Sequence, residues 1–249
     1  FPQELVAVVN GGGVISDLFC HLAFDKIIFT GSTTVGKTIM AAAAENLVPV
    51  ILELGGKSPV IVHSSSDMSD VAQRIAVGKL WNSGQTCVAP DYMFLPKGKT
   101  AEFIEQFETY VFDMYPSILN NPDYTSIVND KQYNRLQGYL ENAKKLGAKI
   151  IEINPQSEDA SLNRKIVPTI LTGVTSDMEI MKNEIFGPIL PIMEYDQIDD
   201  VLAFINSRPR PLALYYFDFD QARADFIAQR THSGHFGINT VLTHVAQDD

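Results

Sequence analysis

The residue best suited to covalent chemistry in this 249-residue chain is Cys87, which lies in the run GQTCVAP at residues 84–90. A helical pattern over residues 69–82 leads to this run, and glycine, small residues and a proline surround the thiol. We therefore expect Cys87 at the end of an element, where a small molecule can reach it. A thiol reacts as its thiolate, so a nucleophilic role requires a lowered pKa or a nearby base. A buried structural cysteine explains the residue equally well.

A second candidate for chemistry is Glu53, near the end of a predicted buried strand at residues 48–54 and directly before Leu54 and two glycines. A carboxylate in such a place is costly unless it is solvated or paired. Desolvation would raise its pKa toward the range that suits a general base near neutral pH. A capping or ion-paired glutamate is the alternative, and the residue type alone favours that alternative.

The third candidate is the loop GSTTVGKT at residues 31–38, between a predicted strand at 26–30 and an alanine-rich helix from about residue 37 to 45. Small residues there let backbone N–H groups approach an anion at the start of a helix. The letters match the phosphate-binding pattern G-x-x-x-x-G-K-[ST], so a P-loop NTPase is one interpretation. That class also needs a strand ending in Asp to hold Mg²⁺, and the nearby strand carries Glu53 instead.

Composition excludes several classes of function. The formal net charge of −11 disfavours nucleic acids and anionic membranes as partners. No apolar run approaches the roughly 20 residues of a membrane span, and no signal peptide opens the chain. Two cysteines do not make a disulfide framework, which predicts a reducing compartment, the cytoplasm. The histidines show no metal-ligand spacing and are predicted to be structural or surface residues: His21, His63, His232, His235 and His244.

These candidates must be positioned by strands that alternate with helices. A strand at residues 5–9, a helix at 14–22 with Cys20 in the core, and the buried strands at 26–30 and 48–54 predict parallel βαβ units. In such sheets, ligands bind at the carboxyl ends of the strands, facing helix N-termini.

The pattern continues along the chain, with residues 154–163 predicted as a surface loop. Apolar runs predict strands at residues 60–62, 92–95, 150–153, 166–171, 189–193, 212–217 and 235–239. An N-cap at Ser66-Asp67 predicts the start of a helix. The spacing of apolar residues predicts further helices at residues 99–114, 131–146, 198–205 and 221–229.

Four motifs give the chain a resemblance to a known family. FTGSTTVG at 29–36, ELGGKSP at 53–59, GQTCVAP at 84–90 and EIFGP at 184–188 occur in the order seen in the aldehyde dehydrogenase superfamily, which the chain resembles along nearly its whole length. The run RPRPLALY at 208–215 is similar to the branch nearest the class 3 enzymes. Residues 121–155 and 244–249 resemble the coniferyl aldehyde dehydrogenase branch.

The resemblance implies an α/β fold with two domains. Residues 1–56 would be the later part of an NAD(P)-binding domain with a partial Rossmann-type parallel sheet, and residues 57–249 an α/β catalytic domain truncated at its end. The chain opens on Phe1 without a Met and ends just after an apolar segment, which suggests an internal fragment. The full-length protein would be a homodimer or a larger homo-oligomer.

The resemblance also implies a covalent mechanism. Cys87 would attack an aldehyde to give a thiohemiacetal, hydride would leave to the nicotinamide, and Glu53 would activate water to hydrolyse the thioester. The backbone N–H of Cys87 would help to hold the oxyanion. The other oxyanion donor of the family is an Asn upstream of this chain.

The implied cofactor is NAD or NADP, and the sequence does not distinguish them. In the family pattern, Ser32 would contact the pyrophosphate, Val35 would pack on adenine, Glu184 would bind the nicotinamide ribose hydroxyls and Phe186 would lie beside the ring. The remaining implied cofactor contacts are Thr30, Gly31, Gly36 and Leu54. Lys37 has no role in this pattern. A non-catalytic nucleotide-binding scaffold is a further interpretation.

The sequence departs from the family near its end, in the run GHFGINT at residues 234–240. His235 and Phe236 are bulky where small residues are usual, and Thr240 replaces an Asp. These changes affect the expected substrate channel.

Overall fold

The computed structural model describes residues 1–159 and 163–246. The chain divides into two compact units, Phe1–Gly55 and Gly56–Asp249, which are described separately below. Residues 160–162 of the predicted loop, and residues 247–249 of the resemblance to the coniferyl aldehyde branch, lie outside the described residues.

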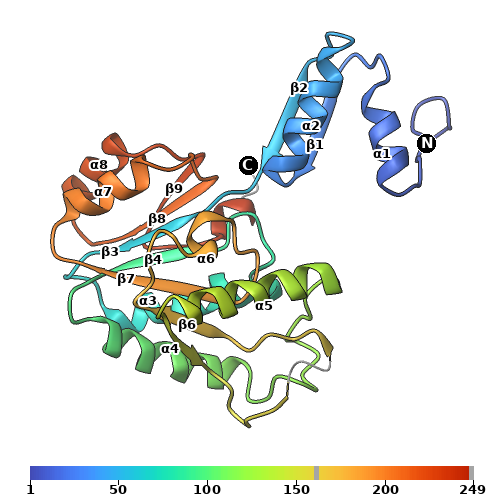
Figure 1. Ribbon diagram of the computed structural model, residues 1–249. Helices are drawn as coiled ribbons and strands as arrows, with labels where there is room; N and C mark the ends of the chain where they lie inside the picture. The colour runs from blue at the N-terminus through green and yellow to red at the C-terminus, as the bar shows by residue number, and fades with distance from the viewer. Residues whose placement is uncertain (160–162, 247–249) are drawn as a thin grey trace. The chain divides into compact units, whose positions relative to one another are not determined.

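The first unit is a single βαβ unit preceded by a helix (Figure 1). Its strands pair in parallel, from Ile27 opposite Val50 to Gly31 opposite Leu54. The elements are α1 (Gly13–Cys20), β1 (Ile27–Gly31), α2 (Thr33–Ala44) and β2 (Val50–Leu54).

Three expectations for this unit are wrong. Residues 5–9 form no strand, because a strand needs a partner and β1 and β2 pair only with each other in the described sheet. Strands β1 and β2 are not buried, since α2 covers only part of them and Ile28 and Ile51 are exposed. Cys20 is half-buried at the end of α1, a helix without buried residues, so it is not a core residue.

Helix α2 begins four residues before the predicted start at residue 37. Ser32 is its N-cap, with an extended backbone and a side-chain oxygen that accepts a hydrogen bond from the Val35 N–H at 3.4 Å. Serine is among the best N-cap residues because it satisfies an N–H of the first turn. Residues 33–38 of the loop that was predicted from the glycine pattern therefore belong to a helix.

The second unit is built on a seven-stranded sheet in the described residues, with strand order β5-β6-β7-β4-β3-β8-β9. Only the β5–β6 pair is antiparallel. The other neighbouring pairs are parallel. The strands are β3 (Pro59–Val62), β4 (Tyr92–Pro96), β5 (Lys149–Glu152), β6 (Thr169–Thr172), β7 (Ile189–Tyr195), β8 (Ala213–Phe217) and β9 (His235–Ile238).

Helices cover both faces of this sheet (Figure 1). Alternating side chains of β3 show why: Val60 and Val62 pack into the core cluster that includes α3 and α4, whereas Ile61 packs into the cluster that includes α5, α7 and α8. A strand buried on both faces has the continuous apolar run from which it was predicted. The helices are α3 (Met68–Leu80), η1 (Trp81–Gly84), α4 (Thr100–Met114), α5 (Asp130–Lys145), α6 (Glu179–Lys182), α7 (Ile198–Asn206), α8 (Gln221–Arg230) and η3 (Thr243–Ala246).

The predicted cap of α3 is confirmed, because the Asp67 side chain accepts a hydrogen bond from the Asp70 N–H at 3.0 Å. The helix ends at Leu80, two residues earlier than expected, and gives way to η1. Within η1, Asn82 and Ser83 adopt left-handed backbone angles that stop an α-helix.

The topology fixes where the sequence motifs lie. In the second unit, Cys87 precedes β4 and Glu184 precedes β7, so both lie at the amino ends of neighbouring parallel strands. In the first unit, Gly31 and Glu53 lie at the carboxyl ends of β1 and β2. Only the first unit therefore follows the expectation that ligand-binding residues follow the strands.

Candidate active site

The turn before Cys87 is held in an unusual backbone conformation. Asn82 and Ser83 each have φ of 52°, and Gly84 has φ of 72°. A Cβ atom on Gly84 would lie 2.3 Å from the carbonyl oxygen of Gly187. Only glycine fits there, and the close approach brings the GQTCVAP and EIFGP motifs into contact.

Side chains anchor this turn on both sides of Cys87. The Gln85 amide donates hydrogen bonds to the Asn82 and Ser126 carbonyls, both at 3.1 Å, and accepts one from the Val128 N–H at 2.9 Å. On the other side, the Tyr215 hydroxyl donates to the Val88 carbonyl at 2.6 Å. Cys87 itself is half-buried and packs against the core cluster on the α3 and α4 face. The thiol thus has a fixed position at an element's end, as the sequence predicted.

Glu184 lies in the irregular segment between α6 and β7. Burial raises the pKa of its carboxyl to about 7, and a hydrogen bond from the Gly56 backbone N–H opposes that shift. Phe186, two residues later, has φ of 50° and an exposed ring. A half-buried carboxylate can accept hydrogen bonds from ligand hydroxyls, and an exposed ring two residues later can pack on a ligand.

Sequence reasoning missed the charged residues buried around Glu184. Asp91 is 3% exposed and Lys79 is 1% exposed. Lys57 has only 11% of its side chain exposed. Burial lowers the pKa of Lys57 and lowers that of Lys79 to about 8. Their positions in the sequence could have indicated them, since Lys57 lies within the ELGGKSP motif and Asp91 directly follows GQTCVAP.

In the first unit, the predicted residues gather at the carboxyl ends of β1 and β2. Thr30 pairs with Glu53, and Gly31 pairs with Leu54. A Cβ on Gly36 would lie 2.8 Å from the Leu54 side chain, so glycine lets α2 pack closely on β2.

The start of α2 fits an anion. Ser32 caps it, residues 33–35 of its first turn are exposed, and Val35 is 47% exposed. Backbone N–H groups at such a helix start suit a phosphate group. Glu53 is exposed rather than desolvated, so the expected burial of its carboxylate is wrong within this unit. Glu53 belongs to the first unit and Cys87 to the second.

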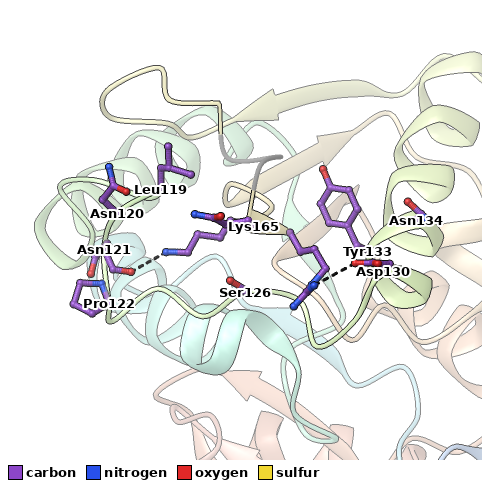
Figure 2. Close-up of a pocket in the computed structure, with 11 residues that line it drawn as sticks. Leu119, Asn120, Asn121, Pro122, Ser126, Asp130, Tyr133, Asn134 and Lys165 are labelled. Carbon is purple, nitrogen blue, oxygen red and sulfur yellow. Dashed lines mark hydrogen bonds and ion pairs between the residues drawn. The ribbon is translucent and has the colours of Figure 1, made fainter.

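The larger of two described pockets lies elsewhere in the second unit, with a volume of about 830 Å³. Figure 2 shows its polar lining, in which Lys165 donates to the Asn121 carbonyl at 2.8 Å and Arg164 pairs with Asp130 at 3.2 Å. None of the predicted site residues lines it, although Ser126 in its wall accepts the hydrogen bond from Gln85.

Residues 1–159 and 163–246 contain neither a metal-binding cluster nor a membrane-spanning helix. No cluster of three or more His, Cys, Asp or Glu side chains could hold a metal ion. No helix there has the length and apolar character to cross a membrane.

Comparisons with known proteins agree with one another. The family model described as "Aldehyde dehydrogenase family" matches residues 1–248. The chain is 49% identical over 249 residues to a probable coniferyl aldehyde dehydrogenase of Pseudomonas aeruginosa, covering 100% of this chain and 52% of that protein. It thus spans about half the length of the curated relatives that it matches.

Solved structures give the same result. The substrate-bound AldH of Staphylococcus aureus is similar with a TM-score of 0.91 and 41% identity, over 99% of this chain and 53% of that one. An aldehyde dehydrogenase of Mycobacterium tuberculosis complexed with NAD⁺ has a TM-score of 0.87 and 28% identity, over 96% and 50%. Other structures of relatives contain NADP.

Proposed function

Because the chain belongs to the aldehyde dehydrogenase family, we propose that the full-length protein oxidises an aldehyde to the carboxylic acid with NAD or NADP. The observation that carries the proposal is the locked turn before Cys87, which positions a thiol next to the segment that contains Glu184. The names of the relatives support an aromatic aldehyde, such as coniferyl aldehyde, as the substrate.

The two compact units have separate proposed roles. The first unit is the later part of the NAD(P)-binding domain, and the second is the catalytic domain. Ser32 and Gly31 bind the pyrophosphate at the start of α2, with Thr30, Gly36 and Leu54 shaping that site. The exposed side chain of Val35 packs on the adenine.

The nicotinamide end of the cofactor is bound in the second unit. Glu184 accepts hydrogen bonds from the ribose hydroxyls, and Phe186 packs beside the ring. The bound cofactor supplies the hydride acceptor.

The chain's own residues perform the remaining chemistry. The Cys87 thiolate adds to the carbonyl carbon of the aldehyde, and the backbone N–H of Cys87 donates to the oxygen that becomes negative. Loss of hydride from this thiohemiacetal leaves a thioester on Cys87. Glu53 then takes a proton from water, which attacks the thioester and releases the acid and the thiolate.

A P-loop NTPase has no support in the comparisons. The loop at residues 31–38 lies inside the aldehyde dehydrogenase match, and Lys37 is exposed on α2. A non-catalytic scaffold is the alternative that the kinetics below test, and the homo-oligomeric state and the cytoplasmic location stay predictions.

The proposed function is tested by rapid-mixing kinetics of full-length variants with an aromatic aldehyde. Cys87→Ala should form no NAD(P)H while still binding the cofactor, since the first unit is untouched. Glu53→Gln keeps shape and hydrogen bonding but lacks the base, so thioester hydrolysis should become slowest and recover partly toward alkaline pH.

The two variants fail in different ways. Dehydrogenase activity that persists in Cys87→Ala would contradict the covalent mechanism. Activity that is present only when the cysteine is present would exclude the non-catalytic scaffold. Unaltered turnover of Glu53→Gln at neutral pH would remove Glu53 from the mechanism.

A further inference from the structure

The segment that carries Glu184 has little regular structure to hold it. Residues 183–188 lie between the short helix α6 and strand β7. Buried backbone groups of such a segment must find partners among side chains, because unpaired groups are costly. The partners of this segment come from distant parts of the chain.

Lys57 holds the start of the segment. Its ammonium group has three hydrogens. They are donated to the Ile180 carbonyl at 2.7 Å, to the Asn183 carbonyl at 2.9 Å and to the Asp91 carboxylate. The donor capacity of this lysine is therefore fully used, and two of its bonds fix the backbone immediately before Glu184.

Asp91 connects that lysine to the other side of Glu184. One carboxylate oxygen pairs with Lys57, and the other accepts a hydrogen bond from the Ile185 N–H at 2.8 Å. The Asp91 backbone N–H donates to the Ser58 carbonyl at 2.8 Å, next to Lys57 in the chain. The carboxylate therefore joins Lys57 to the residue that follows Glu184.

Arg135 of α5 completes the arrangement. Its guanidinium donates to the Glu184 carbonyl at 3.0 Å and to the Ile185 carbonyl at 2.7 Å. Its Nε donates to Gln132 at 2.6 Å, which fixes the guanidinium on its helix. The backbone on both sides of Glu184 is thus bonded to three charged side chains.

A second buried lysine makes Asp91 harder to replace. Lys79 is almost fully buried and interacts electrostatically with Asp91 and Glu184. Without Asp91, two buried ammonium groups would lose the acidic side chain that interacts most strongly with both of them, and an uncompensated buried charge is strongly unfavourable.

We infer that Asp91 and Lys57, assisted by Arg135, are positioning residues that hold the Glu184 backbone so that its carboxylate meets the ribose hydroxyls of the cofactor. The inference rests on the proposed role of Glu184. In this proposal the three residues act through the backbone of residues 180–185 and not by contact with the cofactor.

The test is a double-mutant cycle on cofactor affinity in the full-length protein. The dissociation constant is measured by titration of the aldehyde-free protein with whichever of NAD⁺ and NADP⁺ it binds. Asp91→Asn, Glu184→Gln and the double variant are compared with the unaltered protein. Loss of a hydrogen bond to a charged group corresponds to about tenfold weaker binding or more for Asp91→Asn.

The cycle distinguishes positioning from general structural damage. If Asp91 acts through Glu184, the double variant binds no more weakly than Glu184→Gln alone. Additive losses, or unaltered affinity in Asp91→Asn, would overturn the inference. If Glu184→Gln itself binds the cofactor normally, the proposed role of Glu184 fails and the inference fails with it.

A second cycle covers the case in which Asp91→Asn does not fold. Arg135→Gln leaves the buried pair of Asp91 and Lys57 intact and removes two bonds to the segment, so it should show the same non-additivity with Glu184→Gln. The matched controls are Asp70→Asn and Arg74→Gln, which break an exposed ion pair on α3 and should leave the affinity unchanged.

Discussion

Gly84 is the residue at which two distant motifs of the second unit meet. We predict that Gly84→Ala destabilises the protein by about 2–4 kcal/mol, since a left-handed alanine costs about 1 kcal/mol and the overlap adds about 1–3 kcal/mol. Denaturant unfolding measures the change. Gly98→Ala is the matched control, because Gly98 has φ of 81° but open space around its Cβ position. Equal losses in the two variants would show that contact with Gly187 is not the cause.

Glu184 makes the free energy of unfolding depend on pH, and the direction of this dependence follows from its pKa. Its carboxyl has a folded pKa of about 7, raised from 4.5 mainly by burial. The folded state therefore binds more protons than the unfolded state between these values, and stability is lost as pH rises through that window.

We expect Glu184→Gln to become more stable relative to the unaltered protein as the pH rises. Glu184→Gln is neutral throughout, so its unfolding free energy relative to the unaltered protein should rise by about 1–3 kcal/mol from pH 5 to pH 8. Urea unfolding at the two pH values measures it. An unchanged difference between the proteins would mean that Glu184 titrates alike in the folded and unfolded states.

The proposed site could be read from the sequence only where its candidate residues lie in contiguous motifs. Cys87 and Glu53 stand in short motifs that are readable as letters. Asp91, Lys57 and Arg135 act on backbone groups of residues 180–185, many positions away. A side chain that binds a backbone carbonyl places no requirement on the residue type that it meets, so no sequence pattern records the contact.

At the scale of elements, helix α5 contains a glycine that lowers its stability. Gly138 lies exposed in the helix interior, and a Cβ there would have nothing within 4 Å. Gly138→Ala should stabilise the second unit by about 0.5–1 kcal/mol, because alanine loses less backbone freedom in a helix. Thermal unfolding measures the gain. A loss of stability would contradict the open surroundings of this position.

The elements were predictable to different degrees for physical reasons. Strands β3, β4 and β8 are buried on both faces, so their apolar runs identified them. The run at residues 5–9 is also apolar but forms no strand in the described structure. The start of α2 was missed because threonine and valine are weak helix formers, whereas the cap by Ser32 determines where the helix begins.

At the scale of the molecule, the alternation of strands and helices predicted a parallel α/β fold, and the second unit confirms it with helices on both faces of the sheet. Strand order could not be predicted, because pairing depends on contacts between distant segments. In the second unit, the edge of the sheet that carries the candidate residues Cys87 and Glu184 was also missed. The order of elements places Cys87 and Glu184 before their strands, whereas the expectation for parallel sheets concerns residues that follow them.

That placement has an electrostatic consequence for the second unit. The helix before each of these strands ends at the amino edge of the sheet, so the negative ends of helix macrodipoles gather there. Lys79 lies in the last turn of α3, and Lys57 donates to carbonyls at the end of α6. Each macrodipole end is worth about 0.3–1 kcal/mol to a nearby cation. The macrodipole of α3 thus favours the charged form of Lys79, and the carbonyls at the end of the single-turn helix α6 accept hydrogen bonds from Lys57; at the opposite edge of the sheet Lys79 would face a positive helix end.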